Sequence, residues 1–360
     1  MIYRAIGLMS GSSLDGLDIV FAEIHESGRK WGFDILHAEC IPYTLEWQEK
    51  LKNARQLSAF DYLVLHVEYG RYLGEKVNEF IEKHALHHKV QLVASHGHTV
   101  FHAPEKRMTA QLGDGAAIAA ETGLQVISDL RSLDVALGGQ GAPIVPIGEA
   151  LLLPGFDFYL NIGGIANLTV AGKERIAFDV CPANRVLNTL ANEAGKAYDH
   201  NGAMAAGGNL KEHLLQQLNA LSYYQLPAPK SLANEFGTET VLPILQQSAI
   251  STADALHTMV HHICDQIENS VQQWSEAGKE KRLLVTGGGA FNTYLLTELD
   301  KRLKALDVEI ILPNETLVSG KEALIMAFIG ILRWRQDENV FASVTGASRS
   351  SIGGALWSGS

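Results

Sequence analysis

The sequence predicts an α/β protein made of two similar halves, in which each half forms a sheet with an antiparallel hairpin at its edge. Apolar strand–turn–strand patterns at residues 3–24 and 158–170 begin the two halves. Each pattern is followed by a third apolar segment and then by helical segments that alternate with further strands. The chain has 360 residues, of which 46% are apolar, so each half is long enough to bury its own core.

The first half begins with a strand at 3–8, a turn of small residues and a second strand at 17–24. In the second strand Leu17, Ile19 and Phe21 alternate with other residues, which is typical of a strand with one buried face. Further along we expect strands at 35–43, 90–95 and 124–128, and helices at 45–57, 62–84 and 114–122.

The second half repeats this order, and residues 198–236 are a polar segment with glycine and proline that indicates an insertion. Strands that alternate with helices after a hairpin form an α/β sheet, so the sequence predicts the same kind of sheet twice. The expected strands are 158–162, 165–170, 175–180, 282–286 and 308–312, and the expected helices are 184–194, 251–274, 294–306 and 322–334.

Charge and cysteine content exclude several classes of protein. The formal net charge is −11, from 29 basic and 40 acidic residues, and there is no basic tract, so we expect no nucleic-acid partner and no membrane partner. The three cysteines lack CxxC spacing, which favours a reducing compartment over a zinc site. The N-terminal apolar stretch is short and the apolar run at 323–332 is about half a membrane span, so we expect a cytoplasmic protein.

Three glycine-rich turns follow predicted strands, at residues 10–16, 163–167 and 287–292. None of them matches GxxxxGK[ST] or GxGxxG. Turns with minimal side chains let backbone N–H groups reach phosphate oxygens, although any one such turn is more often an ordinary hairpin or strand–helix connection. Three such turns in two similar halves favour a nucleotide held between domains.

Carboxylates lie beside two predicted strand ends. Asp15 and Asp18 flank the first turn and could hold Mg²⁺, and the alternatives are turn capping for Asp15 and a solvated strand face for Asp18. Asp179 ends an apolar strand, where it could act as a general base or cap the helix that begins near Asn184. Asn184 is the better candidate for the cap, which favours a catalytic Asp179.

Two histidines and an arginine are candidates for recognition of a polar substrate. His96 and His98 stand two apart, but no acidic or thiol partner is near in sequence, so we favour hydrogen bonds to a substrate or to loop backbone over a metal site. Arg131 could bind a carboxylate through two parallel hydrogen bonds. The alternative for Arg131 is a surface ion pair with Asp129 or Asp134.

Taken together and in order, these motifs resemble the anhydro-N-acetylmuramic acid kinases, which belong to the superfamily of sugar kinases, Hsp70 and actin. The resemblance runs nearly from end to end. It is carried by GLMSGSSLDG at 7–16, SHGHTVFH at 95–102, GGQGAPIVP at 138–146, LNIGGIAN at 160–167, FD at 178–179 with Pro182 and Asn184, GGGAFN at 287–292 and SVTGA at 343–347.

The resemblance implies a fold and an activity. The fold would be two RNase-H-like (actin-like ATPase) domains with a central nucleotide cleft. The first domain would comprise residues 1–140 plus 340–360, and the second would comprise 141–339 with the insertion at 198–236. The activity would use ATP and Mg²⁺ to open the 1,6-anhydro bridge of an amino sugar with water and to phosphorylate the freed 6-oxygen. The product would be N-acetylmuramic acid 6-phosphate, for cell-wall recycling.

The resemblance also implies roles for individual residues. Asp179 would be the base that deprotonates the attacking water. The ATP and its phosphates would be bound by Ser10, Gly11, Ser12, Ser13, Asp15, Gly16, Gly163, Gly164, Gly287, Gly288 and Gly289. Mg²⁺ would be held by Asp15 and Asp18, directly or through water. The sugar would be bound by His96, His98, Arg131, Asn184 and Glu322.

The chain departs from the family pattern in four places. It has Ser12 where the family usually has Thr, His98 where it has Gln, and Cys-Pro-Ala at 181–183 where it has Gly-Pro-Gly. Residues 230–235 read KSLANE where the family has Lys-Ser-Thr-Gly-Arg-Glu. The last three changes are expected on the sugar side. The alternative function is therefore a catalytically weakened relative, or pseudokinase, that binds ATP and a related sugar without this turnover. The sequence does not determine the oligomeric state, and a homodimer is one possibility.

Overall fold

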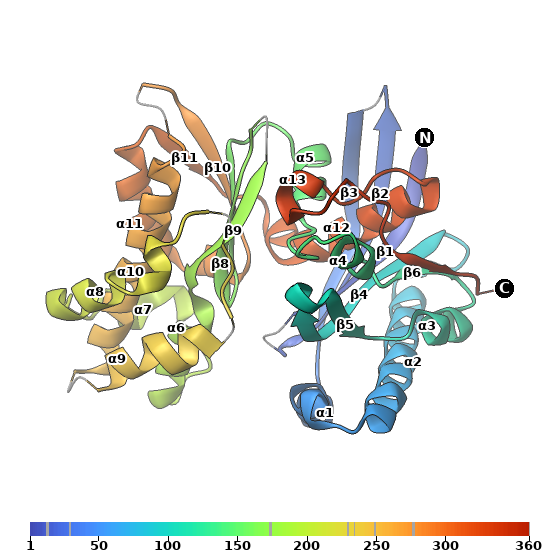
Figure 1. The fold of residues 1–360 in the computed structure, drawn as a ribbon, viewed down its shortest axis with the longest axis horizontal. Helices are drawn as coiled ribbons and strands as arrows, with labels where there is room; N and C mark the ends of the chain where they lie inside the picture. Colours follow the sequence, from blue (N-terminus) through green and yellow to red (C-terminus); the bar gives the residue numbers. More distant parts are fainter. Residues whose placement is uncertain are drawn as a thin grey trace. The chain divides into compact units, whose positions relative to one another are not determined.

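The computed structural model describes residues 1–11, 14–28, 30–172, 175–228, 230–233, 235–247, 250–275 and 278–359. The chain forms two compact units (Figure 1). Unit 1 comprises Met1–Pro154 and Gly320–Ser360, and unit 2 comprises Gly155–Ser319. We expected domain boundaries at residues 140 and 340, whereas the compact units change after Pro154 and after Ser319.

Unit 1 contains a seven-stranded mixed sheet in the order β12-β6-β4-β1-β2-β3, with β5 paired to β4. Strand β2 runs antiparallel to both of its neighbours, β1 and β3, whereas β4 and β6 run parallel to β1. The strands are β1 (Ile2–Ser10), β2 (Gly16–Ser27), β3 (Lys30–Pro42), β4 (Leu92–Ala103), β5 (Met108–Leu112), β6 (Gln125–Ser128) and β12 (Ala355–Trp357).

The helices of unit 1 cover the two faces of its sheet. α2 (Ala59–Lys83) begins earlier than expected because the Ser58 hydroxyl accepts a hydrogen bond from the Asp61 N–H (3.1 Å) and caps the first turn. Its residues Leu65, Tyr69 and Leu73 share a core with β1, β2 and β4. The other helices are α1 (Leu45–Asn53), α3 (Gly115–Thr122), α4 (Ser132–Ala136), α5 (Pro146–Leu151), α13 (Ala342–Thr345) and the short turns η1 (Ala54–Gln56) and η2 (Pro104–Lys106).

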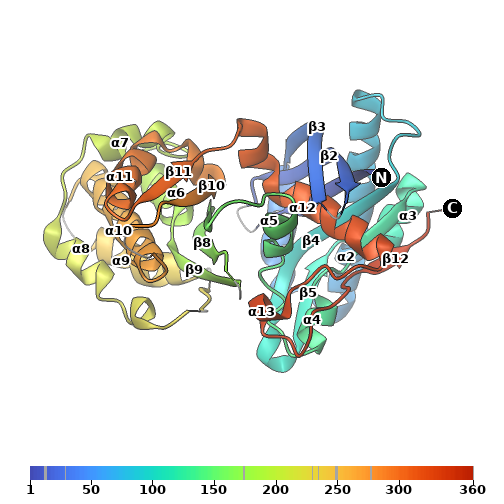
Figure 2. The same ribbon diagram turned by 90° about the horizontal axis from the view of Figure 1, so that it is seen from above.

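Helix α12 (Glu315–Arg335) explains why the second boundary falls at residue 320 (Figure 2). A Cβ atom on Gly7 of β1 would lie 1.8 Å from the carbonyl oxygen of Ala323, and one on Gly330 would lie 2.5 Å from Cβ of Ala94 in β4. Glycines at these two contacts let α12 lie directly on the strands of unit 1. The sequence pattern assigned this helix to the second half because apolar periodicity does not tell which sheet a helix packs on.

Unit 2 contains a five-stranded sheet in the order β11-β10-β7-β8-β9. Its strands are β7 (Phe158–Ile162), β8 (Ile165–Val170), β9 (Ile176–Pro182), β10 (Lys281–Thr286) and β11 (Val308–Ile311). The first three are antiparallel, and β10 runs parallel to both β7 and β11. Both units therefore share the strand order 3-2-1-4-5 of the RNase-H-like fold, which confirms the predicted α/β fold built twice.

The helices of unit 2 surround a core formed by α6, α10, α11 and the apolar faces of the strands. The helices are α6 (Asn184–Glu193), α7 (Ala203–Ala206), α8 (Glu212–Asn219), α9 (Leu242–Gln246), α10 (Thr252–Gln272) and α11 (Thr293–Lys304), with short turns η3 (His200–Gly202), η4 (Ser222–Gln225), η5 (Phe236–Val241) and η6 (Gly288–Phe291). Among the helices of the described ranges, none is long and apolar enough to cross a membrane.

Candidate functional site

The turn after β1 lies beside β4 in unit 1. Ser10, the last residue of β1, is buried, and its hydroxyl accepts a hydrogen bond from the Tyr43 hydroxyl (2.7 Å) and lies 3.0 Å from Nδ1 of His98. The carbonyl of Gly11 accepts a hydrogen bond from the Leu14 N–H at 3.5 Å. Ser12 and Ser13 lie outside the described residues, so the predicted phosphate contacts of this turn remain a prediction.

Gly16 has a structural reason of its own to be glycine. It begins β2, and a Cβ atom there would lie 2.5 Å from the carbonyl oxygen of Ile41 in β3. The close approach of β2 to β3 therefore requires glycine here, independently of any ligand.

Asp18 is half-buried on β2 and faces Cys40 of β3, whose thiol donates a hydrogen bond to the carboxylate. Burial, together with the negative charges of Glu322 and Asp15, raises the pKa of Asp18 to about 6 despite that hydrogen bond. Asp18 is thus not on a solvated strand face, which was the alternative to a metal-binding role.

The fit of Mg²⁺ to these carboxylates follows from their number and surroundings. Within the described ranges no three His, Cys, Asp or Glu side chains are grouped so that they could hold a metal ion. Mg²⁺ is commonly bound by one or two carboxylates while waters and substrate phosphates complete its coordination. A half-buried carboxylate at Asp18 with the exposed Asp15 beside the same turn fits that pattern.

Arg131 and His96 form a buried hydrogen-bonded pair. Arg131 Nε donates to Nε2 of His96 (2.8 Å), and its Nη1 donates to the Gly141 carbonyl (3.2 Å). Because arginine cannot accept, His96 Nε2 carries no proton, so Nδ1 is protonated and donates to the Gly97 carbonyl (2.9 Å). Burial and the charge of Arg131 lower the pKa of His96 to about 3, so this tautomer is neutral at physiological pH.

The surface ion pair considered for Arg131 is not what the structure shows. Asp134 accepts hydrogen bonds from the Gly141 N–H and the Thr345 hydroxyl (both 2.7 Å), and Asp129 accepts one from Ser132 (2.5 Å). Burial lowers the pKa of Arg131 to about 10, against the opposing charge of Glu322. A buried guanidinium has five N–H donors, and the two bonds to His96 and Gly141 leave others for a ligand.

Glu322 lies on the part of α12 that belongs to unit 1, not in the second half where we expected it. Burial raises its pKa, while the charges of Lys321 and Arg131 oppose the rise. Next to it, Lys321 Nζ donates to Glu149 Oε1 on α5 (3.0 Å), and the two side chains are only 2% and 3% exposed. The structure therefore brings Ser10, His98, His96, Arg131, Asp18 and Glu322 into one region of unit 1, linked by contacts and charge interactions.

Asp179 on β9 is held by hydrogen bonds to both carboxylate oxygens. The Leu232 N–H donates to Oδ2 (2.7 Å) and the Asn167 amide donates to Oδ1. Burial raises the pKa of Asp179, and these two hydrogen bonds oppose the rise because they stabilise the ionised form. Asp179 caps no helix, since α6 begins at Asn184 with Ala183 as its N-cap residue and no side-chain cap.

A β-bulge next to Asp179 corrects our expectation for Cys181. Asn167 and Ala166 are neighbours on β8, but they pair with Asp179 and Cys181, so Val180 is an extra residue on β9. The bulge turns Cys181 into the fully buried core of unit 2 instead of onto the face of Asp179. Ala183 is buried in the same core, so these two departures from the family pattern line that core, whereas we expected them on the sugar side.

The turn between β7 and β8 supports the start of α6. The carbonyls of Gly163 and Gly164 accept hydrogen bonds from the N–H groups of Asn184 (3.0 Å) and Ala183 (2.9 Å). The Asn184 amide donates to the Ile162 carbonyl (3.1 Å), so Asn184 fastens the helix to this turn and is not the helix cap that we expected.

The third glycine turn follows β10, and the structure requires glycine at two of its three glycine positions. A Cβ atom on Gly287, whose φ is +82°, would lie 2.8 Å from Asn161 Oδ1, and one on Gly289 would lie 2.2 Å from Cγ2 of Ile162. A Cβ atom on Gly288 would meet only the Asn184 amide, at 3.4 Å. Gly287 and Gly289 are thus needed for packing, whereas Gly288 borders open space.

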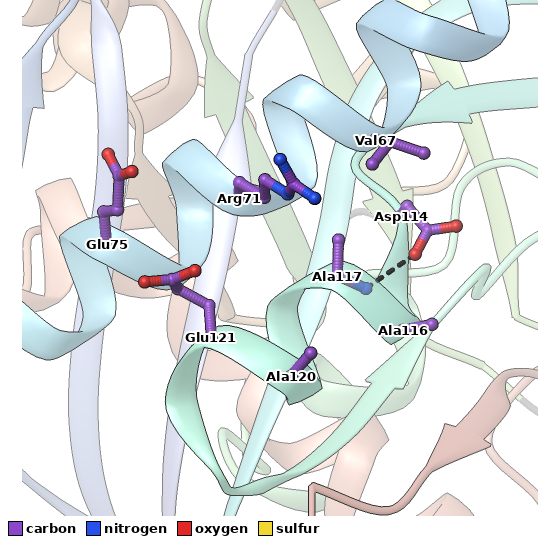
Figure 3. A pocket seen from close by; sticks show the side chains of 8 residues that line it. All are labelled: Val67, Arg71, Glu75, Asp114, Ala116, Ala117, Ala120 and Glu121. Carbon is purple, nitrogen blue, oxygen red and sulfur yellow. Dashed lines mark hydrogen bonds between the residues drawn. The ribbon is translucent and has the colours of Figure 1, made fainter.

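A pocket of about 560 Å³ lies elsewhere in unit 1, between α2 and α3 (Figure 3). Its floor includes the N-terminal turn of α3, where the Ala117 N–H donates to Asp114 (2.6 Å). It is lined by Val67, Arg71, Glu75, Asp114, Ala116, Ala117, Ala120 and Glu121, none of which belongs to the predicted site.

Sequence reasoning missed several residues that hydrogen-bond to the predicted site residues within each unit. Tyr43 reaches Ser10 from the end of β3, and Asn167 and Leu232 reach Asp179 from 12 and 53 residues away. Asn167 ends a motif that we had noticed, LNIGGIAN, but no local pattern marks it as a partner of Asp179. The Leu232 contact is made by backbone, which leaves no signal in residue type.

Comparisons with a family model and with individual relatives identify the same family. A family model described as "Anhydro-N-acetylmuramic acid kinase" matches residues 3–359. A protein of that name from Shewanella sediminis is 35% identical over 370 residues, which cover 98% of this chain and 98% of the relative. Another of that name, from Haemophilus influenzae, is 31% identical over 376 residues, which cover 98% of this chain and 97% of the relative.

Proposed function

Because the chain belongs to the anhydro-N-acetylmuramic acid kinase family, we propose that it is an ATP-dependent sugar kinase of peptidoglycan recycling. It opens the 1,6-anhydro bridge of anhydro-N-acetylmuramic acid and phosphorylates the 6-oxygen, giving N-acetylmuramic acid 6-phosphate. The observation that carries this proposal beyond family membership is the Asp179 carboxylate, which is held at both oxygens by Asn167 and Leu232.

Asp179 acts as the general base in this proposal. A carboxylate oxygen takes a proton from water while the water oxygen bonds to the anomeric carbon and the bond from that carbon to the 6-oxygen breaks. The 6-oxygen forms its new bond to the γ-phosphorus, and ADP leaves. Among the described residues each carboxylate oxygen accepts one hydrogen bond, which leaves it a second lone pair, so Asp179 is both fixed and able to take the proton.

ATP is bound in this proposal by the glycine turns and the carboxylates beside them. The turn at 10–16 and the Gly163-Gly164 turn serve the phosphates, and the open space at Gly288 suits the close approach of the adenosine. Asp15 and Asp18 would hold Mg²⁺, which neutralises phosphate charge when it is bound.

The sugar is bound by Arg131, His96, His98 and Glu322. The spare donors of Arg131 suit the carboxylate of a muramic acid, because a guanidinium matches a carboxylate with two parallel hydrogen bonds. Burial lowers the pKa of His98 to about 4, so it is neutral at physiological pH and suits the hydroxyl and amide groups of an uncharged sugar ring. Asn184 was also expected on the sugar, but its amide bond to Ile162 favours a supporting role.

The pseudokinase alternative drew its support from the change at residues 181–183. Cys181 and Ala183 lie in the apolar core of unit 2, and the bonds to Asp179 are intact. The geometry therefore favours turnover. A coupled ADP-release assay with 1,6-anhydro-N-acetylmuramic acid, beside other anhydro sugars, tests this: we expect sugar-dependent ADP release. ATP binding without release for any sugar would support the alternative.

We also propose a cytoplasmic homodimer. ATP is a cytoplasmic substrate, and α2 carries an unusual apolar stripe, since Phe60, Leu63, Val64 and Val67 are 74%, 60%, 50% and 39% exposed. Spacing of 3, 4 and 7 puts them on one face, so two antiparallel copies of α2 would cover each other about a two-fold axis. Sedimentation should give a dimer mass that Leu63→Asp converts to the monomer mass. A monomeric parent would contradict the dimer.

A further inference from the structure

The outer edge of Asp179 is covered by the insertion. β9 is the edge strand of the sheet in unit 2, and within the described ranges no further strand pairs with the backbone of Asp179 on its outer side. Instead the Asp179 N–H donates to the Lys230 carbonyl (2.9 Å), and the Asp179 carbonyl accepts a hydrogen bond from the Tyr223 hydroxyl (2.6 Å). With the Leu232 N–H on Oδ2 (2.7 Å), Tyr223, Lys230 and Leu232 together bind both the backbone and the side chain of Asp179.

Tyr223 is itself held firmly. Its side chain is buried, with 7% of the residue exposed, and its ring packs against Phe236 with 5.5 Å between ring centroids. Lys230 Nζ lies 4.6 Å from the ring centroid and donates to the Tyr223 carbonyl (3.3 Å). A phenol fixed in this way can hold the atom that it binds, because few of its own torsions remain free.

We propose that Tyr223 is a positioning residue for the base Asp179, an inference that rests on the proposed function. The β-bulge at Val180 interrupts the ladder between β8 and β9 directly beside Asp179, so regular pairing does not fix the strand there. The Tyr223 hydroxyl fixes the Asp179 carbonyl at this point. It thereby sets the position at which the Leu232 N–H meets the carboxylate and the direction in which the carboxylate faces the water.

The neighbouring tyrosine provides a matched control. Tyr224 is half-buried, whereas Tyr223 is buried; its ring lies 5.6 Å from that of Tyr223, and its hydroxyl bonds to Nε2 of His262 (2.9 Å). His262 in turn bonds to Asn219 through Nδ1 (2.7 Å), away from Asp179. Tyr223→Phe and Tyr224→Phe therefore each remove one hydrogen-bonded hydroxyl from the same cluster, but only the first loses a contact with Asp179.

The experiment compares steady-state kinetics of the parent, Tyr223→Phe and Tyr224→Phe, each also in an Asp179→Asn background. We expect Tyr223→Phe to lower kcat by about 10- to 100-fold, because small displacements of a catalytic group have effects of this size. KM for ATP should not change, and Tyr224→Phe should keep kcat within about twofold of the parent, as expected of a residue remote from the reacting atoms. In the Asp179→Asn background, Tyr223→Phe should have no further effect, because the group through which it acts is absent.

Amide hydrogen exchange supplies a readout that does not depend on turnover. The Leu232 amide should exchange faster in Tyr223→Phe than in the parent or in Tyr224→Phe. Two outcomes would overturn the positioning role while the proposed function stands. One is an equal kcat for the two phenylalanine variants. The other is that Tyr223→Phe lowers kcat in the Asp179→Asn background by the same factor as in the parent. A parent without sugar-dependent ADP release would overturn the proposed function and this inference with it.

Discussion

Replacing Asp179 with asparagine removes the proposed proton acceptor and keeps nearly all of its surroundings. The Leu232 N–H, which donates to Asp179 Oδ2 at 2.7 Å, can donate to the asparagine Oδ1 in the same way. The Asn167 amide, which donates to the other oxygen, can turn over and present its own oxygen to the new NH₂ group. We therefore expect Asp179→Asn to fold with its local hydrogen bonds preserved.

The Asp179→Asn substitution should lower turnover strongly, but it should not lower the stability of the folded chain. A positioned general base contributes about 10²–10⁴ in rate, so kcat should fall by at least about 100-fold. Burial raises the pKa of Asp179, which means that at neutral pH ionisation is less favourable in the folded chain than in the unfolded chain. Asparagine removes that cost, so Tm at neutral pH should equal or exceed that of the parent.

Three measurements on one preparation of Asp179→Asn test this reasoning: coupled ADP release, ATP binding by calorimetry and thermal unfolding. In the parent, kcat should fall as the pH drops through the raised pKa of Asp179, because the protonated carboxyl cannot take a proton. Retention of more than about a tenth of parental turnover, with normal ATP binding, would remove Asp179 from the mechanism.

The remaining predictions concern the nucleotide, the metal and a buried ion pair. Gly288→Val should fold, because its Cβ would meet only the Asn184 amide, but its side chain would fill the space assigned to the nucleotide, so ATP binding measured by calorimetry should be lost. Gly289→Val should instead lower Tm in thermal unfolding, because its Cβ would clash with Ile162. Tight ATP binding by Gly288→Val would contradict the assignment. Mg²⁺ should raise the Tm of the parent but not that of Asp18→Asn, since a cation relieves a buried carboxylate; equal shifts would place the metal elsewhere. Lys321→Met should cost about 3–5 kcal/mol in denaturant unfolding because it leaves Glu149 buried without its partner, and adding Glu149→Gln should recover most of the loss; a loss that persists would indicate a packing defect instead.

The sheets could be predicted from the sequence because their signals are local. Apolar runs such as 3–8 and 158–162, each followed by a small-residue turn, mark the hairpins, and the repeat of this order indicates two similar units. The place of Asp179 directly after the apolar residues 176–178 is equally local, although β9 continues past it to Pro182. Its candidacy as a base therefore needed no knowledge of tertiary contacts.

The details that failed depend on contacts between distant segments. We expected residues 181–183 on the sugar side, but the bulge at Val180 places Cys181 in the core, and a single extra residue in a strand leaves no compositional signal. The sequence pattern assigned helix α12 to the second half, whereas most of the helix packs on unit 1. That packing depends on Gly7 and Gly330, which allow close approach, but a single glycine in a strand or a helix does not indicate which element it contacts.

Burial acts on the candidate site with opposite signs for acids and bases, and the combination is informative. In unit 1 it lowers the pKa of His96 and His98 to about 3 and 4, so both rings are neutral hydrogen-bonding groups at physiological pH. It raises the pKa of Asp18 to about 6 in unit 1 and raises that of Asp179 in unit 2, so both carboxylates ionise at a cost to the folded state. A carboxylate that is ionised but poorly solvated attracts a cation or a proton more strongly than an exposed one does. The two acids thus suit the two tasks assigned to them, holding a metal ion at Asp18 and accepting a proton from water at Asp179, whereas the neutral histidines suit a sugar ring that has no charge to offer.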